Sequence, residues 1–274
     1  MTTTLRPTEP LQHSADGALS RAYRICVNSR PVGQLALRTD PRLGSEVGEV
    51  VGLRIDEQDR SRGRGTVALL AAEEIFRDWR CRRVEVTVPA DSAAGLRLAE
   101  ALGYTETSRR LRKCLPATRP ALPPGTTARR MTEAEFGPWL AHEKETYTRS
   151  WTERGLSPER ARAVCEHDHA HAFTDGPRTR GHRLWVLEHE GTVVGTLWLA
   201  DRETDVYVMD VETLPEHRGR GHGRSLMRLA EIDGLSEGHR AVELNVVCAN
   251  TPALRLYESL GYRQETRRFT KDLR

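Results

Sequence analysis

The stretches Arg60-Ser-Arg-Gly-Arg-Gly65 and Arg218-Gly-Arg-Gly-His-Gly223 stand 158 positions apart and open two copies of one pattern. Each copy continues through a helix-like and a strand-like segment to Leu-Gly-Tyr, at residues 102–104 and 260–262. Aligned without a gap, residues 60–115 and 218–273 share 21 identities in 56 pairs. Such a match with constant spacing indicates a duplicated unit, and therefore two domains of one fold.

The composition is typical of a globular protein, with 38% hydrophobic and 30% charged residues among 274. The sequence contains no run of about 18 apolar residues, the length needed to cross a bilayer, so we expect no membrane span. The five cysteines are scattered and form no Cys-x-x-Cys motif, which favours a reducing compartment. Met1-Thr-Thr-Thr4 lacks the basic and then apolar pattern of a secretion signal. The sequence therefore predicts a cytoplasmic protein.

Arginine makes up 39 of the 42 basic residues, and the net charge is +3. No basic stripe interleaved with aromatic residues is visible, so nucleic acid is not expected as a general partner.

A proline-rich segment at residues 116–126 predicts a linker, because proline fixes φ and interrupts helices and inner strands. We therefore expect a mixed α/β fold, with an N-terminal domain at 1–115 and a C-terminal domain at 127–274. Hairpin, strand, helix, strand and helix follow one another in each domain. The expected ranges are 22–27, 32–37, 50–56, 65–80, 83–88 and 92–102, then 183–190, 192–199, 205–213, 223–233, 242–247, 251–260 and 267–273.

The second copy has room for two further helices before its hairpin. Thr132 and Glu135 form a capping-box pattern, and Ser157 before Pro158 is typical of a helix start. The first copy is too short at this place to hold both helices.

A strand followed by an Arg-x-x-Gly-x-Gly loop and a helix is an arrangement that can bind a pyrophosphate. The first turn of a helix has unpaired N–H groups that attract anions, and glycine lets the ligand approach the backbone. Arg218 and Arg220 can add charge-assisted hydrogen bonds. A Rossmann fingerprint is excluded, because its spacing differs and hairpin strands precede this loop.

The segments 214–226, 244–247 and 250–262 resemble the GNAT superfamily of N-acetyltransferases. The resemblance implies two tandem GNAT-type domains, each a twisted mixed sheet flanked by helices. It implies that acetyl-CoA, the acyl donor, binds in a notch where strands 205–213 and 242–247 splay apart. The implied cofactor-binding residues are Thr213, Leu214, Arg218, Gly219, Arg220, Gly221, His222, Gly223, Arg224, Asn250 and Tyr257, with Thr213 and Asn250 on the pantetheine arm.

In this family an amine attacks the thioester directly. Tyr257 stands at the family's tyrosine position, where a phenol can return a proton to the departing thiolate. Asp210 and Glu212 lie on one face of their strand by period two, and either is a candidate general base. A strand-edge carboxylate facing an arginine is the alternative interpretation of each.

The first copy keeps Arg60, Gly63 and Gly65, a possible second cofactor site, but aligns Ala99 with Tyr257 and Ser92 with Asn250. We therefore expect a degenerate, non-catalytic N-terminal domain, with CoA binding and a purely scaffolding role both left open.

His167 and His171 share a helix face at i, i+4, as metal ligands can, but no third ligand is evident and we predict no metal. A wall of the acceptor site and a solvated helix face remain the alternatives.

The sequence thus predicts a GNAT-type acyltransferase whose C-terminal domain moves an acetyl group from acetyl-CoA to an amine, with a small molecule favoured as the acceptor. Two alternatives stay open: a donor other than CoA, such as a carrier protein or charged tRNA, and a non-catalytic CoA-binding or interaction module. The duplicated domains suggest a monomer built as a pseudo-dimer, or a homodimer.

Overall fold

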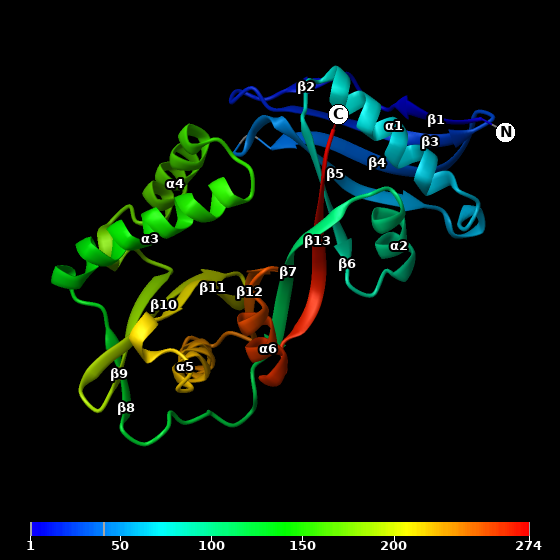
Figure 1. Cartoon of the computed structure of the whole chain (residues 1–274). Helices are drawn as coiled ribbons and strands as arrows, with labels where there is room; N and C mark the ends of the chain where they lie inside the picture. Colours follow the sequence, from blue (N-terminus) through cyan, green and yellow to red (C-terminus); the bar gives the residue numbers. More distant parts are fainter. Residues whose placement is uncertain (1, 41, 274) are drawn as a thin grey trace. The chain divides into compact units, whose positions relative to one another are not determined.

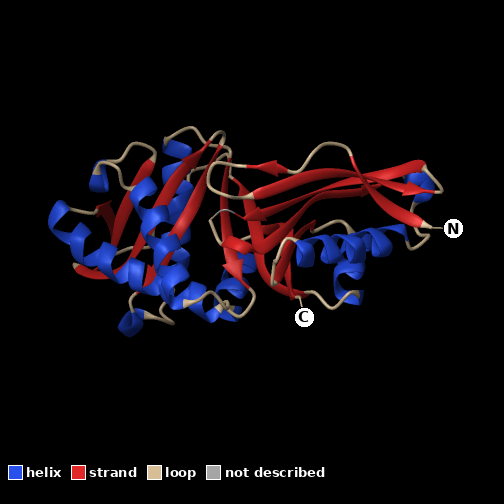
Figure 2. Cartoon of the chain, turned by 90° about the horizontal axis from the view of Figure 1, so that it is seen from above, coloured by secondary structure: helices blue, strands red, loops and turns tan. Residues whose placement is uncertain are grey.

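The computed structural model describes residues 2–40 and 42–273 and divides into two compact units. Unit 1 comprises the described residues of 1–108 and 266–274, and unit 2 comprises residues 109–265. Each unit is a mixed sheet with helices packed against it (Figures 1 and 2). The predicted mixed α/β class with two repeated domains is confirmed.

The sheet of unit 1 has the strand order β1-β3-β4-β5-β6-β13. Its neighbours are antiparallel except β5 and β6, which pair in parallel across helix α1. Ala68, Leu69, Ala72 and Phe76 form a helical stripe on α1 that is buried in the core of the unit. The elements are β1 (Thr3–Pro7), β2 (Gln12–His13), β3 (Leu19–Val27), β4 (Arg30–Asp40), β5 (Gly44–Ile55), η1 (Glu57–Asp59), α1 (Arg64–Asp78), β6 (Arg83–Pro89), α2 (Ala93–Ala101) and the start of β7 (Thr105–Cys114).

The sheet of unit 2 has the order β7-β12-β11-β10-β9-β8, and β11 and β12 are its parallel pair. Helix α5 packs on β10, β11 and β12 through Leu226, Leu229 and Ala230, which are buried. The elements are the end of β7, β8 (Thr126–Arg130), α3 (Glu133–Glu153), α4 (Pro158–Ala172), η2 (Gly176–Arg178), β9 (His182–His189), β10 (Thr192–Arg202), β11 (Asp205–Thr213), η3 (Pro215–His217), α5 (His222–Ser236), β12 (Ala241–Val247), α6 (Thr251–Ser259) and the start of β13 (Arg263–Asp272).

Helices α3 and α4 are the two that the sequence predicted before the second hairpin, and they pack against each other (Figure 1). Thr132 and Glu135 cap α3 reciprocally, which satisfies two N–H groups at its start. Ser157 caps α4 in front of Pro158. An aromatic cluster that includes Trp139 and Trp198 lies beneath them.

The compact units do not follow the repeat boundaries at their last strands. Strand β13 ends the second copy, yet residues 266–272 pair with β6 of unit 1 and bury Phe269 in its core. The end of β7 belongs to the first copy, yet it lies beside β12 and buries Leu111 in unit 2. Each unit therefore contains a strand from the other copy.

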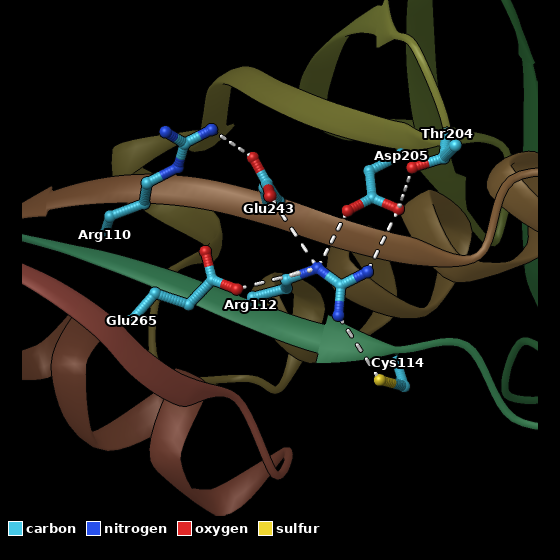
Figure 3. A network of polar contacts seen from close by, with 7 residues as sticks. All are labelled: Arg110, Arg112, Cys114, Thr204, Asp205, Glu243 and Glu265. Carbon is cyan, nitrogen blue, oxygen red and sulfur yellow. Dashed lines mark hydrogen bonds and ion pairs between the residues drawn. The ribbon is translucent and has the colours of Figure 1, made fainter. Parts of the chain in front are cut away.

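Equivalent ion pairs hold both exchanged strands. Arg110 pairs with Glu243 in unit 2, and Arg268 with Glu85 lies at the aligned positions in unit 1. In unit 2, Arg112 also contacts Asp205 at 2.8 Å, together with Glu243 and Glu265 (Figure 3).

A second set of contacts repeats in the same way. Lys113 lies 2.6 Å from Glu231, and Lys271 lies 2.8 Å from Glu73. Because Glu231 and Glu73 are buried, each exchanged lysine neutralises a carboxylate that has left water.

Residues 115–125, between the exchanged strand β7 and β8, form no helix or strand. In the described residues, no helix combines the length and apolar character needed to cross a bilayer. The five cysteines are free, and Cys26, Cys81 and Cys165 are buried.

Candidate active site

The open edge of β11 is the feature that organises the site. β11 and β12 pair in parallel at Val206–Val208 against Val242–Leu244, and the pairs between the described residues end there. β10 continues to pair with β11 as far as Thr213, across a bulge that leaves Met209 out of the ladder. A bulge bends its strand and redirects side chains, and residues 209–213 lie beyond the last pair between β11 and β12, where the expected notch would open.

The loop after β11 presents a helix start without a side-chain cap. Gly219 and Gly221 have φ of 76° and 87°, a left-handed conformation that glycine adopts without strain. Gly221 is the N-cap residue of α5 and supplies no side-chain hydrogen bond to the helix. A Cβ at Gly223 would lie 3.2 Å from Leu256, so glycine also allows close packing on α6. The first-turn N–H groups are thus available to an anion.

Arginines and histidines surround this loop. Arg218 donates from Nε to the Thr213 carbonyl oxygen at 3.1 Å, and Arg224 donates to Ser259 at 2.7 Å. The cavity beside the loop measures about 520 Å³, and its basic lining residues are His189, His217, Arg220, His222, Arg224 and Arg228. This volume is within the range of pockets that hold small-molecule ligands and cofactors. Burial, reinforced by His189 and His217, lowers the pKa of His222.

Two of the predicted cofactor-binding residues, Leu214 and Asn250, have structural roles of their own. Leu214 donates its N–H to the Val194 carbonyl at 3.0 Å and fixes the end of β11. The Asn250 side chain caps α6 by accepting from the Ala253 N–H at 3.2 Å. Ser92 caps α2 in the same way, so the cap is common to both copies. Because the cap uses only the oxygen of Asn250, its NH₂ group is still able to donate.

Asp210 and Glu212 occupy different electrostatic settings on β11. Asp210 is half-buried, and loss of hydration, followed by repulsion from Glu143 and Glu212, raises its pKa well above the usual value. Two basic side chains lie beside Glu212: His142 Nε2 is 3.0 Å from its carboxylate, and an Arg218 nitrogen is 3.7 Å from it. The two carboxylates that the sequence could not tell apart therefore differ in their partners.

Tyr257 is buried on α6, with its ring 5.7 Å from that of Tyr262. Burial, with a smaller contribution from the charge of Asp210, raises the pKa of Tyr257 to about 12. Its phenol is therefore protonated at neutral pH.

Helices α3 and α4 bring three residues to this region that the sequence did not identify. His142 contacts Glu212, and Glu143 acts on Asp210. His169 on α4 is buried, and its Nε2 lies 3.7 Å from Glu143 Oε1. The signal that could have found His169 is the apolar stripe of α4, because the buried Ala161, Cys165 and Ala172 lie on the same helix face.

His167 and His171, which the sequence did single out, stack with ring centroids 4.5 Å apart on the exposed side of α4. Across the described residues, no group of three His, Cys, Asp or Glu side chains is arranged as a metal site.

Unit 1 repeats the loop but not its surroundings. Arg60 donates from Nε to the Ile55 carbonyl at 3.0 Å, and Gly63 is an uncapped N-cap residue with φ of 71°. A Cβ at Gly65 would lie 3.3 Å from Leu98, as at Gly223 and Leu256. The buried Asp59, however, holds Arg30 and Arg64 beside this loop.

The chain is similar to known proteins over both copies of the repeat. Residues 3–104 and 139–262 match the model of the acetyltransferase (GNAT) family. The mycothiol acetyltransferase of Thermobispora bispora is 31% identical over 227 residues, which cover 75% of this chain and 70% of that protein. The mycothiol acetyltransferase of Streptomyces griseus is 26% identical over 258 residues, covering 88% and 76%.

Solved structures share the fold. A GCN5-related N-acetyltransferase from Sphaerobacter thermophilus aligns with a TM-score of 0.62 and 22% identity, over 92% of this chain and 81% of that one. A tandem GNAT protein from the clavulanic acid biosynthesis pathway aligns with a TM-score of 0.52 and 19% identity, over 95% and 85%. With two family segments and the tandem fold, the chain belongs to the GNAT family of acetyltransferases.

Proposed function

We propose that unit 2 transfers an acetyl group from acetyl-CoA to the amine of a small molecule. The observation that carries this proposal is the uncapped start of α5 at Gly221, which follows β11 with Asp210 and packs through Gly223 on α6, the helix of Tyr257. A group that can accept a proton and a group that can return one thus lie next to an uncapped helix start.

The residues of unit 2 fit the donor. The pyrophosphate would bind the first-turn N–H groups after Gly221, where the helix dipole favours anions. Arg220 and Arg228 line the adjoining cavity and suit the remaining phosphate charge. When bound, acetyl-CoA supplies the activated thioester.

Asp210 is our candidate for the general base. An acceptor amine is mostly an ammonium at neutral pH, because its pKa resembles that of lysine, about 10.4. A carboxylate with a raised pKa accepts its proton more readily than an ordinary one. Glu212 is less suited to this step, since His142 Nε2 and an Arg218 nitrogen already lie beside its carboxylate, at 3.0 Å and 3.7 Å.

Asp210 removes one proton from the ammonium, and the amine nitrogen then bonds to the thioester carbon. The C–S bond breaks, and the CoA sulfur receives a proton from Tyr257. The second proton of the nitrogen restores the Tyr257 phenol, and Asp210 releases its proton to water. Protonated Asp210 no longer opposes loss of the phenol proton, so the first transfer prepares the second. The net reaction converts an ammonium and acetyl-CoA into an amide, free CoA and one released proton.

The relatives support a small-molecule acceptor, because they are named mycothiol acetyltransferases. Within this class of small-molecule amines, the precursor of mycothiol is therefore a specific candidate acceptor for this chain. The similarity of 26–31% identity favours it, although it spans only part of each relative.

Thiol release from acetyl-CoA with a panel of amines, including the mycothiol precursor, tests the proposal. We expect Tyr257→Phe to lower kcat roughly 10²–10⁴-fold, the usual contribution of a positioned general acid. Tyr262→Phe is the matched control, because Tyr262 is a neighbouring buried ring whose hydroxyl has no hydrogen-bond partner among the described residues. Wild-type protein that neither binds nor cleaves acetyl-CoA but accepts acyl groups from a carrier protein or charged tRNA would refute the assigned donor.

A further inference from the structure

Unit 1 presents two exposed arginines on the face of its sheet that lies away from α1 (Figure 2). Leu35 and Leu37 of β4 are buried in the core with α1, so the alternate residues of β4 lie on the other face. Gln34 is one of these, and it pairs across the strands with Arg24 of β3 and Arg54 of β5. The side chains of Arg24 and Arg54 form no ion pair or hydrogen bond with any described residue.

A nearby arginine on the same face shows what this row lacks. Arg38 lies four residues beyond Gln34 on β4 and donates to Glu49 of β5 at 2.7 Å. Arg24 and Arg54 instead flank the uncharged Gln34. Since neighbouring strands lie about 4.8 Å apart, the Cα atoms of the two arginines are roughly 10 Å from each other. The row therefore has two positive charges and no negative charge within it.

The three side chains of the row line one cavity of about 320 Å³. This volume is at the lower end of the range for small-molecule sites. Asp56, just beyond the end of β5, also lines the cavity, and its carboxylate has no hydrogen-bond partner among the described residues. The register of β4 and β5 shifts directly after Gln34, and such irregularities redirect side chains beside binding sites.

The corresponding place in unit 2 carries the opposite charge. The offset of 158 residues aligns Arg54 with Glu212. It also aligns Val51, at the register shift of β5, with Met209, which the bulge of β11 leaves unpaired. In unit 2 a residue of α3, His142, contacts Glu212, whereas the described part of unit 1 contains no equivalent of α3. The same strand position thus holds a covered carboxylate in unit 2 and an exposed arginine in unit 1.

A phosphoryl group matches the donors of the cavity. Each guanidinium supplies a fork of N–H donors and one positive charge, and the Gln34 amide supplies an NH₂ group. A phosphate monoester has a charge of about −1.5 to −2 at pH 7 and three acceptor oxygens, so one group can meet all three side chains. Asp56 can only accept hydrogen bonds when ionised, so it favours a ligand that has a hydroxyl group beside the phosphate.

We propose that unit 1 binds a small phosphate ester, with its phosphoryl group between Arg24 and Arg54 and a hydroxyl group at Asp56. This site is additional to the donor and acceptor sites proposed for unit 2, and it does not depend on them.

Calorimetric titration of glycerol 3-phosphate into the Gly221→Glu variant tests the inference, because the added carboxylate repels phosphate from the loop of unit 2. Arg24→Gln and Arg54→Gln, each added to this variant, should weaken binding about 10-fold, since each removes a hydrogen bond between charged groups. Arg38→Gln is the matched control and should retain the affinity, because it changes an exposed arginine that already pairs with Glu49.

Related compounds define the class of ligand. Inorganic phosphate should bind more weakly than glycerol 3-phosphate, and Asp56→Ala should remove this difference, because the hydroxyl groups lose their acceptor. Glycerol should not bind. Succinate that binds more tightly than glycerol 3-phosphate would identify a dicarboxylate site and overturn the proposal.

Two further outcomes contradict the inference. One is the absence of binding, or a loss below about 2-fold in both Arg24→Gln and Arg54→Gln. The other comes from hydrogen exchange in the wild type, which needs no variant to fold. Glycerol 3-phosphate should slow exchange in β3, β4 and β5, and slowing confined to unit 2 would place the phosphate at the start of α5 instead.

Discussion

Units 1 and 2 each place an uncapped glycine at the start of a helix, Gly63 and Gly221, both in the left-handed conformation. In each, an arginine reaches back to the preceding strand, from Arg60 to Ile55 and from Arg218 to Thr213. The backbone that suits a pyrophosphate is therefore present twice.

The charges around the two loops differ. In unit 1 the buried Asp59 pairs with Arg30 at 2.7 Å and with Arg64, so these cations are already neutralised. In unit 2 the position aligned with Asp59 is His217, and the position aligned with Arg64 is His222. Ser61, with φ of 58°, replaces Gly219 and holds a conformation that side chains disfavour. The two loops therefore have the same backbone conformation, but the charges around them favour phosphate only in unit 2.

The proposed acid–base residues of unit 2 have no counterparts in unit 1. The offset of 158 residues aligns Gly52 with Asp210, Arg54 with Glu212 and Ala99 with Tyr257. Unit 1 therefore lacks every acid–base group proposed for unit 2. The comparison teaches that a loop motif alone does not identify a catalytic copy.

The largest effect is expected at Asp210. Asp210→Asn should lower kcat/KM by roughly 10²–10⁴-fold, because the amine loses its proton acceptor. Glu203→Gln at the exposed β10–β11 turn is the control. Loss of less than about 5-fold would mean that Asp210 does not act as the base, and that Glu212 should be examined next.

The same variant should be more stable than wild type at high pH. The pKa of Asp210 is raised by folding, so wild-type stability is fully present below the unfolded pKa of about 3.9 and falls as pH rises through the folded value. The amide that replaces the carboxyl group in Asp210→Asn does not titrate, so the increase in melting temperature should be clear at pH 8 and small at pH 4. Equal melting temperatures at pH 8 would contradict the raised pKa.

A smaller effect, on stability, is expected from substitutions in the exchanged strands β7 and β13. Each substitution should destabilise the unit that its strand has joined. Lys113→Met leaves Glu231 buried without its cation and should destabilise unit 2 by about 3 kcal/mol, the lower end for a broken buried pair. Lys271→Met should do the same to unit 1 through Glu73. Each lysine thus acts on the unit built mainly from the other copy.

Hydrogen exchange measured by mass spectrometry locates these effects. Faster exchange in α5 and β12 for Lys113→Met, and in α1 and β6 for Lys271→Met, is the expected pattern. Lys144→Met, at a more exposed ion pair with Glu166, should change little. Exchange that accelerates in the copy carrying the substitution would contradict the strand exchange.

The sequence predicted the repeated strand and helix order and both helix starts at Thr132 and Ser157, because these depend on local patterns. It also predicted the loop glycines as the positions where the backbone approaches a ligand. Strand exchange was not predictable, since β7 and β13 have the same pattern whichever sheet they join. The contact of His142 with Glu212 spans 70 residues of sequence, and that of Glu143 with His169 joins two helices, so no local pattern encodes either one.

Calorimetric titration of acetyl-CoA tests whether unit 2 alone holds the donor. Gly221→Glu and Gly63→Glu are matched variants, because each adds one carboxylate and the same backbone strain at an equivalent N-cap position. We predict a single site in the wild type that Gly221→Glu abolishes and Gly63→Glu retains. Two sites in the wild type, or a single site lost only in Gly63→Glu, would contradict the account.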